Sequence, residues 1–117
     1  MIFDDDEDIL SICNYILEED GWQVRTFVNC EDIVTRVSDF LPDVIIMDNW
    51  IPHEGGVTAT REIKAEPALA AIPVIYFSAN SDIEQLAAAA GADEMLPKPF
   101  DLEALRSIVT NALDKCH

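Results

Sequence analysis

The segment Asp43-Val44-Ile45-Ile46-Met47-Asp48 decides the fold of this chain. Its four consecutive apolar residues predict a short strand buried on both faces, as in a parallel sheet. The strand ends at the carboxylate of Asp48, and Pro52 with Gly55-Gly56 marks a loop beyond it. In open parallel sheets, ligands bind beyond the carboxyl ends of the strands. Asp48 is therefore either a functional acid at such a site or a loop residue that accepts a backbone hydrogen bond.

The length and composition predict one globular domain that covers residues 1–117, and 50% of the residues are hydrophobic. No apolar run approaches the roughly 18 residues of a membrane span, and the acidic N-terminus does not resemble a signal peptide. The three cysteines, Cys13, Cys30 and Cys116, are odd in number and lack metal-ligand spacing. We therefore expect reduced thiols in a cytoplasmic protein.

The charge is strongly one-sided, with 7 Lys and Arg against 23 Asp and Glu, a net charge of −16. Such a surface argues against direct binding to nucleic acid or to an anionic membrane, because both need cationic side chains. Two interpretations of the acid excess stay open. It is a solvated surface that keeps the protein soluble, or some of the acids cluster to hold a divalent cation.

Apolar periodicity predicts five strands that alternate with five helices, without repeats or linkers. This alternation predicts an α/β fold with a parallel sheet covered by helices on both faces, a three-layer sandwich. The strand order 2-1-3-4-5 of the doubly wound, flavodoxin-like fold suits this size. The expected strands are 2–3, 22–28, 43–48, 72–77 and 93–97, and the expected helices are about 6–20, the segment after 29, 57–66, 81–90 and the segment after 101.

Local signals predict where several helices begin and which residues they bury. Asn29 is expected to cap the second helix, Ser81 to open a capping box at the fourth, and Asp101 to cap the last. Ile12 falls on the predicted apolar face of the first helix and Leu102 on that of the last.

Five polar residues follow the ends of different strands: Asp4 and Asp5, Asp48, Ser78 and Lys98. Parallel strands end at one rim, so these residues are expected to converge. Three close carboxylates repel one another, and Mg²⁺ with oxygen ligands relieves that repulsion. A phosphoryl group on Asp48 would give the hydroxyl and the ammonium their acceptors. The alternatives are that residues 4–8 are a solvated helix start and that Lys98 is a surface lysine.

Four segments together identify a family resemblance. They are Phe3-Asp4-Asp5-Asp6-Glu7-Asp8-Ile9-Leu10, Pro42-Asp43-Val44-Ile45-Ile46-Met47-Asp48, Ile72-Pro73-Val74-Ile75-Tyr76-Phe77-Ser78-Ala79, and Gly91-Ala92-Asp93-Glu94-Met95-Leu96-Pro97-Lys98-Pro99-Phe100. In this order and at these spacings the chain resembles the receiver domain of bacterial two-component response regulators over essentially its whole length.

The resemblance implies that Asp48 accepts a phosphoryl group from the phosphohistidine of a histidine kinase or histidine phosphotransfer protein. It implies Mg²⁺ held by Asp5, Asp48 and the backbone carbonyl of Trp50, with Asp4 bound directly or through water. Ser78 and Lys98 would hold the phosphoryl oxygens, and the Lys98-Pro99 peptide would be cis. Such a domain catalyses only its own phosphorylation and dephosphorylation.

The resemblance also implies a switch that runs from Ser78 to the surface of the fourth and fifth strands and helices, a face that can form a homodimer.

This chain departs from the usual family pattern in three ways. The first strand is very short, Met95 stands where the family usually has an aromatic residue, and the segment from Ser78 to Lys98 is about two residues shorter than usual. Trp50 and Asn80 should border the entrance for hydrolytic water, and the bulk of Trp50 predicts slow self-dephosphorylation.

Two other function classes are alternatives to a phosphorylated receiver. A degenerate receiver that acts only as an interaction module, independently of phosphorylation, would have lost an acid, the hydroxyl or the lysine, and none is lost here. A small Mg²⁺-dependent phosphatase with an aspartyl nucleophile usually carries a second acid two residues later, where this chain has Trp50. Reaction with a small phosphodonor separates the three classes.

Overall fold

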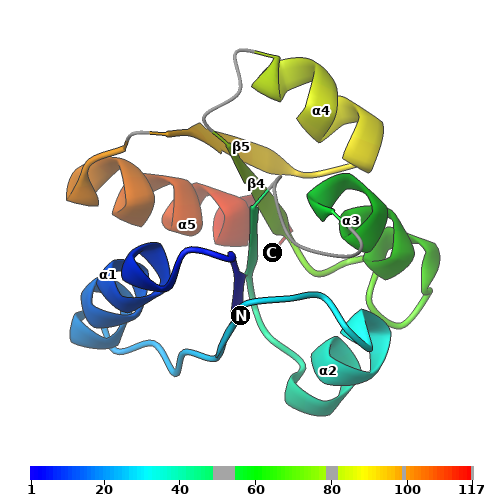
Figure 1. The fold of residues 1–117 in the computed structure, drawn as a ribbon, viewed down its shortest axis with the longest axis horizontal. Helices are drawn as coiled ribbons and strands as arrows, with labels where there is room; N and C mark the ends of the chain where they lie inside the picture. Colours follow the sequence, from blue (N-terminus) through cyan, green and yellow to red (C-terminus); the bar gives the residue numbers. More distant parts are fainter. Residues whose placement is uncertain (49–54, 79–81, 99, 117) are drawn as a thin grey trace.

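The computed structural model describes residues 1–48, 55–78, 82–98 and 100–116. Strands and helices alternate along them, as the periodicity predicts (Figure 1). The elements are β1 (Ile2–Phe3), α1 (Glu7–Glu19), β2 (Thr26–Phe27), α2 (Ile33–Phe40), β3 (Ile45–Asp48), α3 (Gly56–Ala65), β4 (Val74–Ser78), α4 (Ile83–Ala90), β5 (Glu94–Pro97) and α5 (Leu102–Cys116).

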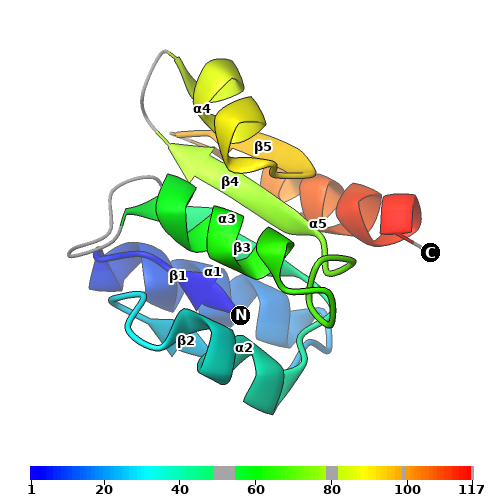
Figure 2. The same cartoon turned by 90° about the vertical axis from the view of Figure 1, so that its right-hand side faces the viewer.

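The sheet has five parallel strands in the order β2-β1-β3-β4-β5, which confirms the predicted order (Figure 2). Although β1 has only two residues, it pairs on both sides, and Ile2 is the partner of both Thr26 and Ile46. The register pairs Asp48 with Phe77 on the next strand. The carboxyl ends of β1, β3, β4 and β5 therefore lie at one rim of the sheet.

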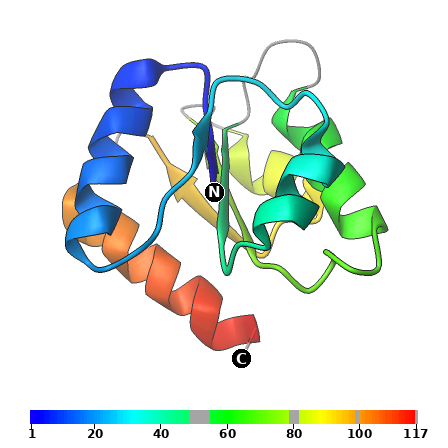
Figure 3. The same ribbon diagram turned by 90° about the horizontal axis from the view of Figure 1, so that it is seen from below.

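Helices cover both faces of the sheet, with α1 and α5 on one side and α2, α3 and α4 on the other (Figure 3). Alternate strand residues divide between the two sides. Ile46 and Phe77 pack with α1 and α5, whereas Met47 packs with α2 and α3, and Tyr76 packs with α4. Burial on both faces explains why β3 and β4 are continuous apolar runs rather than alternating ones.

The cap predicted for the last helix is confirmed. The Asp101 carboxylate accepts a hydrogen bond from the Ala104 N–H at 2.7 Å and so caps α5. Gly21, just past α1, and Gly91, at the end of α4, have φ of 92° and 79°. This left-handed conformation favours glycine. The structure starts α4 at Ile83, and Ser81 lies outside the described residues.

The cap predicted at Asn29 is wrong. The Asn29 side-chain oxygen accepts hydrogen bonds from the Glu31 N–H at 3.1 Å and from Arg36 Nη1 at 2.9 Å, so it is engaged in a turn before the helix. Helix α2 begins at Ile33, after Asp32 in the left-handed region at φ 51°. The second strand is also shorter than predicted, and Trp22 is a half-buried residue outside it.

Two predicted core positions are exposed instead. The side chain of Ile12 is 51% exposed, because it lies two residues after the buried Leu10 and so about 200° around the helix. Leu102 is 49% exposed, since it is the first residue of α5 and burial begins one turn later at Leu105. Other apolar residues of these two helices, including Cys13 and Val109, are buried in the core.

A lysine joins α3 to the segments that flank β4 and β5. Lys64 Nζ donates to the carbonyl oxygens of Ala70 and Ile72 at 3.1 and 2.8 Å, and to Asp93 Oδ2 at 2.7 Å. The same Asp93 oxygen accepts the Val74 N–H at 2.9 Å. The amino end of β4 is therefore held by charge-assisted hydrogen bonds. Among the described residues, none of the helices is both long and apolar enough to cross a membrane.

Candidate functional site

Asp48 lies at the carboxyl end of β3 and is 4% exposed. Asp4 directly follows β1 and is fully buried, with its backbone N–H donating to the carbonyl of Phe27 at 3.1 Å. Lys98 directly follows β5, and its N–H donates to the carbonyl of Ser78 at 2.9 Å. Strand pairing thus fixes the backbone from which each of these side chains leaves the sheet.

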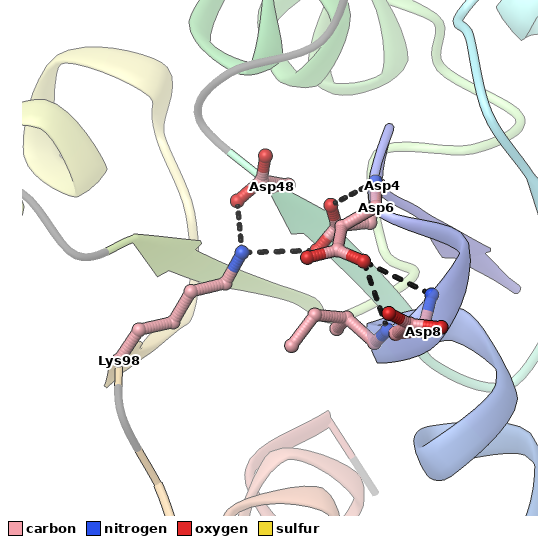
Figure 4. Close-up of polar contacts among 6 residues, drawn as sticks. Asp4, Asp6, Asp8, Asp48 and Lys98 are labelled. Atoms are coloured by element: carbon pink, nitrogen blue, oxygen red, sulfur yellow. Dashed lines mark hydrogen bonds and ion pairs between the residues drawn. The ribbon is translucent and has the colours of Figure 1, made fainter.

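Lys98 connects the two buried carboxylates (Figure 4). Its ammonium nitrogen lies 2.8 Å from Asp48 Oδ1 and 3.0 Å from Asp4 Oδ2. The lysine side chain is 19% exposed, so both ion pairs are largely shielded from water. Residues from the first, third and fifth strand ends therefore meet at one rim, as the sequence predicts.

The acidic run after β1 divides into different roles. Asp6 caps α1, since its Oδ1 accepts the N–H groups of Asp8 at 3.0 Å and Ile9 at 3.4 Å. Asp4 Oδ1 accepts the Asp6 N–H at 2.9 Å, so both Asp4 oxygens have a partner. Asp5 is exposed. The run is thus a helix start and part of the rim site at once.

The acids at the rim fit a divalent cation. One ligand oxygen each from Asp4, Asp5 and Asp48 lies within 4.8 Å of the others. Carboxylate oxygens suit a hard cation such as Mg²⁺, and the charge of Lys98 balances only one of the three carboxylates. Because both oxygens of Asp4 are already hydrogen-bonded, the exposed Asp5 is better placed than Asp4 to bind the ion directly.

Burial and pairing shift the pKa values of the charged groups. Burial raises the pKa of the Asp4 carboxyl above its ordinary value, although hydrogen bonds from the Asp6 amide and from Lys98 oppose the shift. Burial disfavours the charged form of Lys98, but Asp48 and Asp4 outweigh it, so the pKa of Lys98 lies above its ordinary value. The lysine is therefore a cation at neutral pH.

The two predicted switch residues lie on adjacent strands. Ser78, the last residue of β4, is 5% exposed and lies one position beyond the register partner of Asp48. Met95 in β5 is half-buried and is the register partner of Tyr76. The rim thus includes Ser78, whereas Met95 lies further back along the sheet. Four residues discussed from the sequence, Trp50, Asn80, Ser81 and Pro99, lie outside the described residues.

Sequence reasoning missed one residue at the rim. From the sequence, Phe77 is only the last residue of the expected strand 72–77, and in the structure it is fully buried. Its ring centroid, however, lies 4.6 Å from the Lys98 ammonium. The rings of Phe77 and Phe100 are nearly perpendicular, with an interplanar angle of 87° and centroids 5.1 Å apart. The sequence of a continuously apolar strand does not indicate which of its residues contacts the lysine. The only signal for the contact is that Phe77 directly precedes Ser78 and is the register partner of Asp48.

Known proteins share this fold and this arrangement of segments. A family model described as the response regulator receiver domain matches residues 1–110. The chain belongs to the response regulator receiver domain family. Receiver domains of this family are signalling domains that interact with histidine kinases or phosphotransfer proteins.

Two curated relatives illustrate the likeness in sequence. The chain is 37% identical over 117 residues to the DNA-binding transcriptional regulator NtrC of Azospirillum brasilense, covering 97% of this chain and 24% of the relative. It is 27% identical over 110 residues to the phosphate regulon transcriptional regulatory protein PhoB of Rhizobium meliloti, covering 92% of this chain and 48% of that relative. The chain thus spans less than half the length of these relatives.

Solved structures agree with the fold. The signal receiver domain of a signal transduction histidine kinase from Syntrophus aciditrophicus superposes with a TM-score of 0.88 at 32% identity, covering 97% of this chain and 88% of the other. The receiver domain of NtrX from Brucella abortus gives 0.86 at 26% identity, covering 97% and 96%.

Proposed function

We propose that Asp48 accepts a phosphoryl group from a phosphohistidine on a histidine kinase or histidine phosphotransfer protein. The observation that carries this proposal is the contact of 2.8 Å between the Lys98 ammonium and Asp48 Oδ1, beside the carboxylates of Asp4 and Asp5. A buried carboxylate held next to a fixed cation at the rim is a preorganised nucleophile.

In the transfer, a bond forms between a carboxylate oxygen of Asp48 and phosphorus while the nitrogen–phosphorus bond of the donor breaks. The imidazole nitrogen keeps the electron pair of the broken bond. Lys98 balances charge beside the acceptor, and Ser78 donates its hydroxyl to a phosphoryl oxygen. Asp5 and Asp48 would hold Mg²⁺, with the Trp50 carbonyl and with Asp4 directly or through water. The ion would neutralise charge on the phosphoryl oxygens.

The remaining parts of the proposal concern the setting. Residues 1–117 act as a single receiver unit in the cytoplasm, as the pattern of free cysteines suggests. Phosphorylation changes the surface of α4, β5 and α5, and the output passes to a partner or to a second copy through that face. The net charge of −16 makes direct contact of this unit with nucleic acid unfavourable.

The test is incubation of the purified protein with acetyl phosphate and Mg²⁺, followed by intact-mass spectrometry. We expect one added phosphoryl group that is lost in base, and none in Asp48→Asn. Asp43→Asn, at the other end of the same segment, is the control for the loss of one negative charge and should be phosphorylated normally. An adduct that persists in Asp48→Asn contradicts the assignment. No reaction at all would favour an interaction module, and multiple turnover would favour a phosphatase.

A further inference from the structure

The Lys98 ammonium has a third neighbour besides the two carboxylates. The ring centroid of Phe77 lies 4.6 Å from Nζ, within the distance at which a ring face attracts a cation. Phe77 is itself held firmly, because it is fully buried and packs in a perpendicular pair with the ring of Phe100, with centroids 5.1 Å apart. The ring is therefore a fixed surface against which the lysine rests.

Phosphorylation of Asp48 would move negative charge away from the carboxylate and onto the phosphoryl oxygens. The hydrogen bond from Lys98 to Asp48 Oδ1 is directional and must be exchanged for one to the phosphoryl group. The attraction to a ring face tolerates sideways movement of the cation, so it can persist through this exchange. The buried ring also excludes water from one side of the ammonium, which strengthens its ion pairs.

We infer that Phe77 is a positioning residue that keeps the Lys98 ammonium beside Asp48 before, during and after phosphoryl transfer. The inference rests on the proposed function of Asp48. The role assigned to Phe77 is exerted through the lysine, whose ammonium it contacts. If the Phe77 ring holds the ammonium, the rate of phosphorylation depends on the electron density of that ring. If Phe77 only fills space in the core, the rate does not depend on it.

The sharpest test replaces Phe77 by monofluoro-, difluoro- and trifluorophenylalanine, which keep the shape but progressively weaken the negative ring face. We expect the initial rate of phosphorylation by acetyl phosphate to fall stepwise, by about fivefold at the trifluoro analogue, which corresponds to about 1 kcal/mol. The same series at Phe40 is the control, because that ring faces Arg25 at 5.2 Å and lies at the other end of β3. Equal rates across the Phe77 series would overturn the inference.

A second measurement does not need phosphorylation. Lys98 ε-methylene protons next to the Phe77 ring should resonate upfield in the NMR spectrum, should keep that shift in Phe77→Tyr and should lose it in Phe77→Leu. An ordinary Lys98 shift in the native protein would overturn the inference, whatever acetyl phosphate does. Failure of the native protein to take up a phosphoryl group, with the ring-current shift present, would instead contradict the proposed function while the contact stands.

Discussion

Tyr76 on β4 and Met95 on β5 are register partners, and both pack on the sheet face that α4 covers. Tyr76 is fully buried and precedes Ser78 by two residues, so both point to that face of the sheet. In β5 the flexible thioether of Met95 can repack without moving between two discrete positions, whereas the ring of Tyr76 is rigid.

We therefore predict that binding of a beryllofluoride mimic shifts the NMR signals of Tyr76 and of α4 residues more than those of Met95. The Met95→Tyr variant is the comparison, and it should increase the response at position 95. A large response in the native protein that is confined to Met95 and Ser78 would show that methionine supports the switch by itself.

Mg²⁺ should stabilise the native chain because it relieves repulsion among the rim carboxylates. At a concentration ten times its dissociation constant, an ion that binds only the folded state adds about 1.4 kcal/mol, or roughly 5 °C in melting temperature for a domain of this size. We expect Asp5→Asn to lose most of this shift. Asp8→Asn, an exposed change in the same acidic run, should keep it. Equal shifts in native protein and Asp5→Asn would refute the role of Asp5.

The fold and most of the site could be predicted because they depend on long-range rules that local detail does not disturb. Continuous apolar strands alternating with helices predict a parallel sheet, and a parallel sheet brings Asp4, Asp48 and Lys98 to one rim. The predicted convergence of Lys98 with Asp4 and Asp48 is confirmed. The structure adds that the ammonium pairs with both carboxylates, at 2.8 Å from Asp48 and 3.0 Å from Asp4. The roles of these residues in phosphoryl transfer stay predictions.

The parts that sequence reasoning missed depend on which hydrogen bonds a side chain makes among several that are possible, and on the direction in which a side chain points. Asn29 has the chemistry of a helix cap, but Arg36 and the Glu31 amide use its oxygen first. Phe77 lies in a strand that is apolar throughout, and nothing in that pattern says which ring faces the lysine. Lys64 and Asp93 pair across 29 positions, and no spacing rule connects them.

The pairing of Lys64 with Asp93 should contribute more to stability than the larger set of ion pairs around Arg106. Lys64 is 18% exposed and donates to three acceptors, two of them backbone carbonyls. Arg106 contacts Glu19, Asp20 and Glu103, but the partners are exposed by 37 to 84%. The variants Lys64→Met and Arg106→Met each remove one positive charge from a protein of net charge −16. The change in overall charge is therefore the same in both, and a difference in stability reports the local contacts.

We expect Lys64→Met to lower the free energy of unfolding by about 2 kcal/mol and Arg106→Met by at most about 1 kcal/mol. Urea unfolding followed by circular dichroism measures both. Similar losses would mean that the Lys64 hydrogen bonds are replaced by water.

Cys13 should make the protein less stable at alkaline pH. Burial, and then the charge of Asp4, raise the pKa of the Cys13 thiol from 9.0 to about 11. Between pH 9 and pH 11 the unfolded chain releases the thiol proton while the folded chain keeps it. The free energy of unfolding is therefore unaffected by this group below pH 9 and falls as the pH rises toward 11. The loss is on the order of 2 kcal/mol. Burial and the charge of Asp48 raise the pKa of Tyr76 to about 12, which adds a loss of the same sign at higher pH.

The measurement is urea unfolding at pH 8 and pH 11. Cys13→Ala and Cys13→Ser should both be less stable than the native protein at pH 8, yet should lose less on going to pH 11. A pH dependence equal to that of the native protein in both variants would exclude the thiol as its source.

Thr60 should be a site where removing a hydroxyl stabilises the protein. Among the described residues, its Oγ1 is the buried side-chain oxygen that has no hydrogen-bond partner, and the residue is fully buried in α3. A buried hydroxyl without a partner costs about 1–3 kcal/mol, and valine has nearly the same shape. We therefore expect Thr60→Val to raise the free energy of unfolding by about 1 kcal/mol.

Thr58→Val, an exposed position of the same helix, carries the same change in helix propensity and should have almost no effect. The difference between the two variants in urea unfolding isolates the cost of burying the hydroxyl. If Thr60→Val is no more stable than Thr58→Val, the hydroxyl has a partner in solution, such as a bound water.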